Sequence, residues 1–265
     1  IVILVWYTRM MPEFSGRAAP DRILPLLWRR QRPAIRAKGR PPRLNVDAVV
    51  EAAIDRADAD GLAAASMARI GKDLGVGTMT VYTYVPSRDE LIDLMVDEVL
   101  NRRALPGPGE HRPAAWRDQV QLYADRTRAM YAAHPWLAQV SQVRPPVGPG
   151  MLAEREYVLS VVRGLGLPVD RVNTAAVTIQ AFVTAAARSL AEIELVRQAT
   201  GETDDAWWLQ RQDLWETWFD VDRHPAMTDL WNAGGFDRGP DEQVLDAYRY
   251  GLELILDGLD RASRE

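Results

Sequence analysis

Cysteine is absent from this chain of 265 residues, and histidine occurs only three times. Without cysteine there are no disulfides, no thiolate metal sites and no cysteine nucleophile, which fits the reducing cytoplasm. His111, His134 and His224 each lie within two residues of a proline, so they indicate loops or helix ends rather than a metal cluster. We therefore expect a cytoplasmic protein without a metal.

The sequence motifs of enzymes are missing as well. There is no phosphate-binding loop, no dinucleotide-binding glycine fingerprint and no nucleophile elbow. Glu192 and Glu194 are two residues apart and would point to different sides of a helix, so they do not form an acid/base pair. We expect no catalysis and no cofactor.

No apolar run is long enough to cross a bilayer. The first residues, IVILVWYTRMM, contain seven successive apolar residues, whereas a membrane-spanning helix needs about 20. The segment also lacks the features of a secretory signal. We expect no membrane partner, and interpret these residues as an upstream-extended reading frame or a cloning remnant, with Met10 or Met11 as the natural start.

The net charge of −5 conceals a basic segment. Residues 28–43 read WRRQRPAIRAKGRPPR, with seven arginine or lysine residues and no acid. Such a run can be a solvated tail, but it directly precedes the first helix of a predicted DNA-binding block. That position favours an arm that follows a minor groove or phosphates, with Arg40 and Arg43 in contact with DNA.

Helical start and stop signals dominate the remaining sequence. Capping asparagine and serine residues, helix-ending glycines and one proline predict short helices over 45–61, 66–75, 77–85 and 87–100. Apolar periodicity predicts longer helices over 116–133, 151–164, 172–199, 205–221 and 242–262, and no strand is convincing. The expected fold class is all-α, with a disordered or irregular extension over 1–43, a helix-turn-helix domain over 44–104 and a larger helical domain over 105–265.

The stretch LGVGTMTVYTYVPSRDEL, residues 74–91, is rich in hydroxyls and rings. Two short helices joined by a glycine-containing turn are typical of a helix-turn-helix, whose second helix enters the major groove. Threonine and tyrosine can donate to phosphates or bases, and methionine can touch a thymine methyl. The alternative is an ordinary helix connection with half-buried tyrosines. The glycine placement, the capping box of Ser87 and Glu90 and the basic arm favour DNA binding.

Residues 44–102 closely resemble the DNA-binding domain of the tetracycline-repressor (TetR) family, through AAIDRADADGLAAASMARIGKDLGVGTMTVYTYVPSRDELIDLM. The resemblance implies a homodimer on a palindromic operator, released when a small molecule binds to a C-terminal ligand-binding and dimerisation domain. It also implies a set of DNA-facing residues: Ser66, Met67, Thr78, Met79, Thr80, Tyr82, Tyr84 and Arg88.

This chain departs from the family pattern in the second helix. Ala68 stands where the family often has arginine, and we expect Arg69 or the basic arm to replace that contact. Gly71 stands where the family usually has alanine, which should loosen the helix by up to about 1 kcal/mol.

The larger helical domain offers weaker signals. Apolar stripes along 172–199 and 242–262 fit either a monomer core or a helical dimer face, and the resemblance favours the dimer. Tryptophans at helical spacing are often core or interface anchors, but they can also line an apolar or aromatic effector pocket. Our candidate ligand-binding residues are Tyr123, Arg126, Trp136, Tyr157, Gln180, Trp208 and Trp215.

The sequence thus predicts a ligand-responsive, DNA-binding transcriptional regulator, and most simply a repressor. Its expected partners are double-stranded operator DNA, a second copy of the chain and a small-molecule effector. The alternative is an all-α small-molecule-binding or enzymatic protein with a vestigial helix-turn-helix. Salt-sensitive binding to operator DNA separates the two hypotheses.

Overall fold

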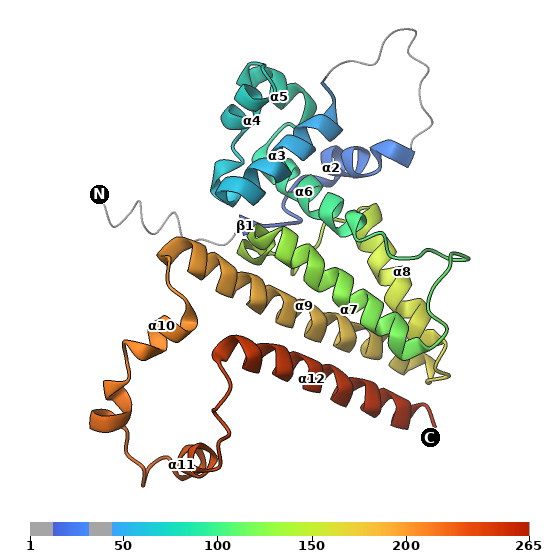
Figure 1. The fold of residues 1–265 in the computed structure, drawn as a ribbon. Coiled ribbons are helices and arrows are strands. Elements are labelled where there is room, and N and C mark those ends of the chain that lie inside the picture. The colour runs from blue at the N-terminus through green and yellow to red at the C-terminus, as the bar shows by residue number, and fades with distance from the viewer. Residues whose placement is uncertain (1–12, 32–43, 265) are drawn as a thin grey trace. The chain divides into compact units, whose positions relative to one another are not determined.

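The computed structural model describes residues 13–31 and 44–264. Its first elements are β1 (Glu13–Phe14), α2 (Pro20–Leu27), η1 (Arg29–Gln31), α3 (Val46–Asp60), η2 (Leu62–Ala64), α4 (Met67–Asp73), α5 (Thr78–Tyr84) and α6 (Arg88–Arg102). There follow α7 (Trp116–Ala133), η3 (Pro135–Gln139), β2 (Val140–Ser141), α8 (Pro149–Arg163), α9 (Val169–Thr200), α10 (Asp204–Leu209), the π-helical turn η4 (Leu214–Trp218), α11 (Pro225–Asn232) and α12 (Pro240–Ala262). The all-α class is confirmed (Figure 1). Within the described residues, the strands we did not expect form one parallel two-residue pairing between β1 and β2.

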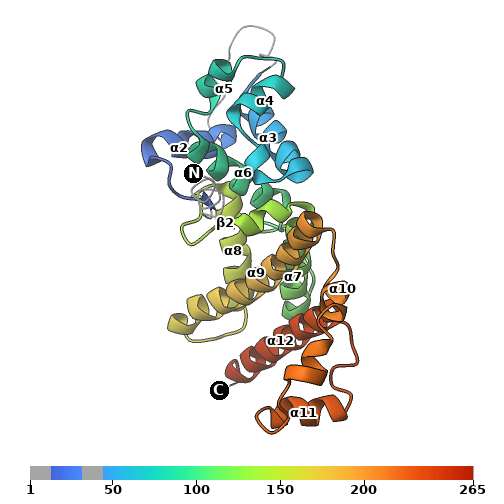
Figure 2. The same cartoon turned by 90° about the vertical axis from the view of Figure 1, so that its left-hand side faces the viewer.

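The chain divides into a first unit, residues 1–191, and a second unit, residues 192–265. In the first unit α4 and α5 pack together at one end, and α6 packs against α2, α3 and α8 (Figures 1 and 2). Ile54, Ile70, Leu91 and Met95 are fully buried in its core. Because α6 packs against α8, both helices belong to the first unit, and the predicted domain boundary at residues 104 and 105 stays a prediction.

The short helices of residues 44–104 form where the capping signals place them. Asn45 accepts a hydrogen bond from the backbone amide of Ala48 at 2.8 Å and begins α3. At the start of α6, the Ser87 hydroxyl oxygen accepts from the Asp89 amide at 3.1 Å and the hydroxyl donates to the Glu90 carboxylate. The predicted helix starts at these two positions are confirmed.

Part of the N-terminal extension differs from our expectation. Residues 13–31 are not irregular: they form β1, α2 and η1, and α2 buries Ile23 and Leu27. Pro20 stands at the first helical position, where its missing amide is not needed and its fixed φ favours the helix. The rest of the extension, residues 1–12 and 32–43, lies outside the described residues.

The predicted helix over 205–221 is wrong. The structure breaks it into α10 and the π-helical turn η4, with α11 following after His224. None of the residues of α10, η4 or α11 is buried. Because packing supplies most of the stability of a helix in a protein, a segment without a buried face is not held in one long regular helix.

Candidate nucleic-acid interface

The turn between α4 and α5 is compact because glycine stands at two critical positions, Gly75 in the turn and Gly71 in α4. Gly75 has φ +69°, a left-handed conformation that glycine adopts without strain. A Cβ on Gly71 would lie 3.0 Å from the carbonyl oxygen of Val76, and the Val76 amide donates to the Gly71 carbonyl at 2.8 Å. Gly71 therefore lets the turn pack directly on α4, a benefit of this glycine that the helix-propensity argument overlooked.

The recognition helix α5 has one buried side and one exposed side. Val81 and Val85 are fully buried, whereas Met79 is 77% exposed and Tyr82 is 40% exposed. Thr80 is also exposed, and Thr78 and Tyr84 are partly exposed. All five predicted DNA-facing residues of α5 are thus accessible, and their contact with DNA stays a prediction.

The second helix of the motif requires a correction. Met67 is only 6% exposed and packs in the core, so its side chain does not face DNA as we predicted. Ser66 is partly exposed, and its hydroxyl oxygen accepts from the Arg69 amide at 3.4 Å as the cap of α4. Arg69 has a 57% exposed side chain and only a 3.5 Å ion pair to Asp60, so it can reach a phosphate where Ala68 cannot.

Arg88 is engaged inside the protein. Its guanidinium forms an ion pair with Glu13 at 2.8 Å and donates to the carbonyl oxygens of Ala65 at 3.0 Å and Leu62 at 3.3 Å. These bonds tie α6 to the segment that leads into α4, so Arg88 supports the motif rather than offering a free cation to phosphate. Arg40 and Arg43, the predicted arm contacts, lie outside the described residues.

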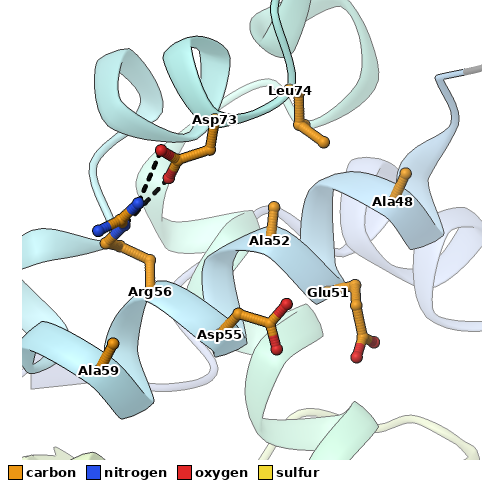
Figure 3. A pocket seen from close by; sticks show the side chains of 8 residues that line it. All are labelled: Ala48, Glu51, Ala52, Asp55, Arg56, Ala59, Asp73 and Leu74. Carbon is orange, nitrogen blue, oxygen red and sulfur yellow. Dashed lines mark hydrogen bonds and ion pairs between the residues drawn. The ribbon is translucent and has the colours of Figure 1, made fainter.

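A groove of about 580 Å³ runs between α3 and the end of α4 (Figure 3). Its lining residues are Ala48, Glu51, Ala52, Asp55, Arg56, Ala59, Asp73 and Leu74. Arg56 crosses it and donates to both carboxylate oxygens of Asp73, at 2.7 and 3.0 Å. These hydrogen bonds raise the pKa of Arg56, which stays cationic. Three carboxylates against one paired cation do not attract phosphate, so this groove is not part of the DNA surface.

A buried polar centre connects α6 to the helices that follow it. Arg103, whose side chain is 1% exposed, forms an ion pair with Glu154 at 2.7 Å and donates to the Thr127 hydroxyl at 3.0 Å. The Tyr123 hydroxyl donates to the other Glu154 oxygen at 2.6 Å. Burial alone would raise the pKa of Glu154, but the charge and hydrogen bonds of Arg103 and the bond from Tyr123 hold that pKa below its ordinary value. Burial raises the pKa of Tyr123.

Most of the predicted ligand-binding residues of the first unit have internal partners. Trp136 donates to Asp58 at 2.7 Å, and the Tyr157 hydroxyl donates to the Gln119 carbonyl at 2.9 Å. Arg126 donates to the carbonyl oxygens of Arg103 and Ala104. Gln180 hydrogen-bonds to Glu154 in the buried polar centre. Sequence reasoning missed Arg103, Thr127 and Glu154 because nothing in a helical charge pattern tells which charges become buried.

The second unit gathers aromatic rings although its helix is broken. The Trp215 ring lies 6.4 Å from Trp208, 5.2 Å from Phe219 and 5.6 Å from Trp231 between ring centroids. A pocket of about 250 Å³ opens beside these rings. Its lining residues are Trp215, Phe219, Val221, Met227, Thr228, Trp231, Asn232 and Phe236. Trp208 and Trp215, the predicted ligand-binding tryptophans, therefore belong to one ring cluster.

The described residues offer neither a cluster of metal ligands nor a membrane-spanning helix. They contain no group of three or more His, Cys, Asp or Glu side chains placed to hold a metal ion. No helix among them has the length and apolarity needed to cross a membrane.

Comparison with known proteins gives consistent matches. Residues 108–262 match the family described as tetracyclin repressor-like, C-terminal domain. The chain is 39% identical over 249 residues to the HTH-type transcriptional repressor DrrR1 of Streptomyces coeruleorubidus, covering 94% of this chain and 88% of that protein. An HTH-type transcriptional regulator of Saccharopolyspora erythraea is 29% identical over 160 residues, covering 59% of this chain and 64% of that protein. Among solved structures, the Streptomyces coelicolor TetR family protein ActR in complex with actinorhodin aligns with a TM-score of 0.66 and 28% identity, over 84% of this chain and 99% of that chain.

Proposed function

The chain belongs to the TetR family of transcriptional regulators, and from this premise we propose that it is a repressor that binds a palindromic operator as a homodimer and leaves it when a small molecule binds. The single observation that carries the DNA-binding part is the two-sided character of α5. Val81 and Val85 anchor the helix, and its threonines, tyrosines and Met79 stay accessible. An accessible polar helix behind a tight turn is the arrangement that reads a major groove.

Fluorescence polarisation with the DNA upstream of the protein's own gene tests this proposal. We expect Tyr82→Ala and Thr80→Ala to weaken binding about tenfold, as each removes one base or phosphate contact. Thr178→Ala is the matched control because Thr178 is an exposed threonine on α9. Binding by the wild type that is weak and independent of sequence would refute the proposal.

The basic arm is proposed to add phosphate contacts through Arg40 and Arg43. Deleting residues 1–43 is a poor test, because it would also remove β1, α2 and η1. Replacing both arginines by glutamine leaves those elements in place. We expect the plot of the logarithm of the binding constant against the logarithm of the salt concentration to lose about 0.9 of its slope for each lost phosphate contact. An unchanged slope would leave the arm without a role in DNA binding.

The proposed effector is an apolar or aromatic small molecule. ActR has been crystallised with actinorhodin, which is a precedent for a small-molecule ligand in a relative. Tyr123, Arg126, Trp136 and Tyr157 hold the helices together through internal bonds, so we propose them as framework. Gln180 belongs to the buried polar centre and is grouped with them.

We keep the effector-binding role for the ring cluster around Trp208 and Trp215; Trp215 lines the pocket, and Trp208 stacks on Trp215. Its pocket has aromatic walls and no charged side chain among its lining residues. Quenching of tryptophan fluorescence across a panel of aromatic compounds tests this assignment. We expect Trp215→Leu to lose the quenching and Trp116→Phe, outside the cluster, to retain it; equal quenching in both variants would contradict the assignment.

A further inference from the structure

Residues 13–31 form a segment that we call the N-terminal strap. It comprises β1, α2 and η1, and α2 packs against α6 in the first unit (Figures 1 and 2). Ser15, Ala18, Ile23 and Leu27 of the strap are buried. The strap is therefore part of the packed structure of this unit.

The strap binds an acidic face of α6 that is itself buried. This face carries Glu90, Asp93 and Asp97, which recur at the spacing of one helix side. Arg22 of the strap lies 3.0 Å from the Glu90 carboxylate, and the Gly16 amide donates to Asp93 at 2.6 Å. One turn further along, Asp97 accepts the amide of the third residue of α8 at 3.1 Å. A single side of α6 thus holds both the strap and the start of α8.

The other edge of the strap binds the loop of residues 140–148. β1 pairs in parallel with β2, and the Ser15 amide donates to the Ser141 carbonyl at 3.1 Å. The Ser15 hydroxyl lies 3.1 Å from the carbonyl oxygens of Ser141 and Arg144. At the far end of the strap, the Trp28 indole donates to the Val147 carbonyl at 3.0 Å. The loop is therefore fastened to the strap at both ends.

The strap also reaches the helices of the DNA-binding motif. Glu13 pairs with Arg88, whose guanidinium also holds the Ala65 carbonyl just before α4. Arg29 donates to Asp47 in the first turn of α3 at 2.5 Å. Burial opposes ionisation of Asp47, but the hydrogen bonds and charges of the neighbouring arginines lower its pKa, so it remains an anion. The strap is in contact, directly or through one side chain, with α3, α6 and the approach to α4.

From these contacts we propose that the strap is a positioning element for operator binding, because it fixes the helix-turn-helix to the 140–148 loop. A shift of that loop relative to α6 must break strap contacts, so the loop and the helix-turn-helix move together. By linkage, if DNA binding to α5 stabilises one position of the loop, then stabilising that position of the loop strengthens DNA binding by the same free energy. The inference rests on the proposed function, since it presumes that the motif binds operator DNA.

Gly16 provides a local way to disturb the strap. Its φ is +71°, and a Cβ at this position would lie 2.3 Å from the Arg144 carbonyl oxygen. Gly16→Ala thus combines backbone strain with a clash between strap and loop. Gly109 has a similar φ of +80° and no atom within 4 Å of the added Cβ, so Gly109→Ala reproduces the strain without the clash. Ser15→Ala is a second, milder variant, because it removes only the hydroxyl contacts to the loop.

The test combines hydrogen exchange with affinity, on the full chain with and without the DNA upstream of its own gene. In the wild type we expect DNA to slow amide exchange in residues 66–84 and also in residues 140–148. In Gly16→Ala the DNA-dependent change at 140–148 should disappear, and in Ser15→Ala it should become smaller. Operator affinity should fall about five- to tenfold in Gly16→Ala, within the usual range of coupling between sites, while Gly109→Ala should match the wild type in both measurements.

The outcomes are separable. If DNA protects residues 66–84 of the wild type but leaves 140–148 unchanged, the strap does not couple the two places. The inference also fails if Ser15→Ala and Gly16→Ala retain the response at 140–148. Should Gly16→Ala not fold, as judged by circular dichroism, Ser15→Ala alone decides between these results. If the wild type shows no protection of 66–84 and no salt-sensitive DNA binding, it is the proposed function that fails.

Discussion

The buried pair of Arg103 and Glu154 makes a quantitative prediction about stability. In Glu154→Gln the shape of the side chain is retained and Tyr123 can still donate to the amide oxygen, but Arg103 loses its counter-ion. The Arg103 side chain is 1% exposed, so water does not replace the lost carboxylate. Breaking a buried pair by removing one partner costs about 3–5 kcal/mol. We take about 3 kcal/mol, because Glu154 is 14% exposed and Arg103 keeps its bonds to Thr127 and the Leu100 carbonyl.

Urea denaturation followed by circular dichroism measures this loss directly. A destabilisation of about 3 kcal/mol corresponds to a fall in Tm of roughly 6–12 °C for a unit of 150–250 residues. Asp125→Asn is the control, because Asp125 pairs with Arg128 at 3.4 Å on the exposed side of α7. Exposed pairs contribute about 0–1 kcal/mol, so this variant should be near neutral.

The pH dependence gives a second check on the same pair. The pKa of Glu154 is lowered from 4.5 in the folded chain, so its stabilising contribution is present above pH 4.5 and is lost as the pH falls through the lowered value. The difference between wild type and Glu154→Gln should therefore shrink in acid. Equal stability of Glu154→Gln and Asp125→Asn at pH 7 would refute the view that this ion pair is closed to solvent.

Further predictions concern the DNA-binding block, α6 and α12. Tyr82→Ala should weaken operator binding while leaving Tm within about 2 °C, because its ring is accessible; a large Tm loss would mean that the ring packs instead. Met67→Ala should lower the free energy of unfolding by about 2–5 kcal/mol, as expected of a buried side chain, and near-neutral denaturation would contradict its core position. Burial raises the pKa values of Asp93 and Asp97 to about 6, above the ordinary value of 3.8, so the folded chain takes up protons before the unfolded chain does. Stability should therefore rise as the pH falls from 7 towards 5, by at most about 1.4 kcal/mol per pH unit for each group, and denaturation at three pH values should show a flatter profile in Asp93→Asn and Asp97→Asn. Leu254 of α12 is 54% exposed, and in the proposed homodimer Leu254→Glu should yield monomers by light scattering; an unchanged mass would exclude this side of α12 from the dimer.

Local signals were sufficient to predict the helices of the DNA-binding block. Asn45 and Ser66 cap α3 and α4, and Gly75 makes the left-handed turn that admits α5. These effects act within a few residues, so they can be read from a single sequence. On α5, Val81 and Val85 are four residues apart and therefore share one side of the helix, and both are buried.

Features that depend on distant partners were not predictable in the same way. Arg88 finds Glu13, 75 residues away, and this pairing changes its role from phosphate ligand to internal support. Met67 directly follows a helix cap and could have faced either way; only the packed core decides that it points inward. We expected a disordered or irregular extension over residues 1–43, but Ile23 and Leu27 of α2 are buried once α6 is in place to pack against them.

The break in the tryptophan-rich segment has a related cause. The periodicity of Trp208, Trp215 and Phe219 indicated one helix, yet rings can cluster across a chain break as well as along a helix. The rings did come together, but the backbone between them is not one helix. The sequence therefore predicted correctly that these rings lie together, but not that the backbone between them leaves the helix.

The N-terminal strap has a practical consequence for grafting. A chimeric regulator made by joining residues 44–104 to a foreign effector domain would leave the buried acidic face of α6 without Arg22 and the Gly16 amide. The Glu90 and Asp93 carboxylates, which the native strap pairs with Arg22 and the Gly16 amide, would then meet whatever surface the recipient offers. A transferable DNA-binding domain therefore starts at residue 13. The recipient domain must supply a strand, as β2 does here, with which β1 can pair.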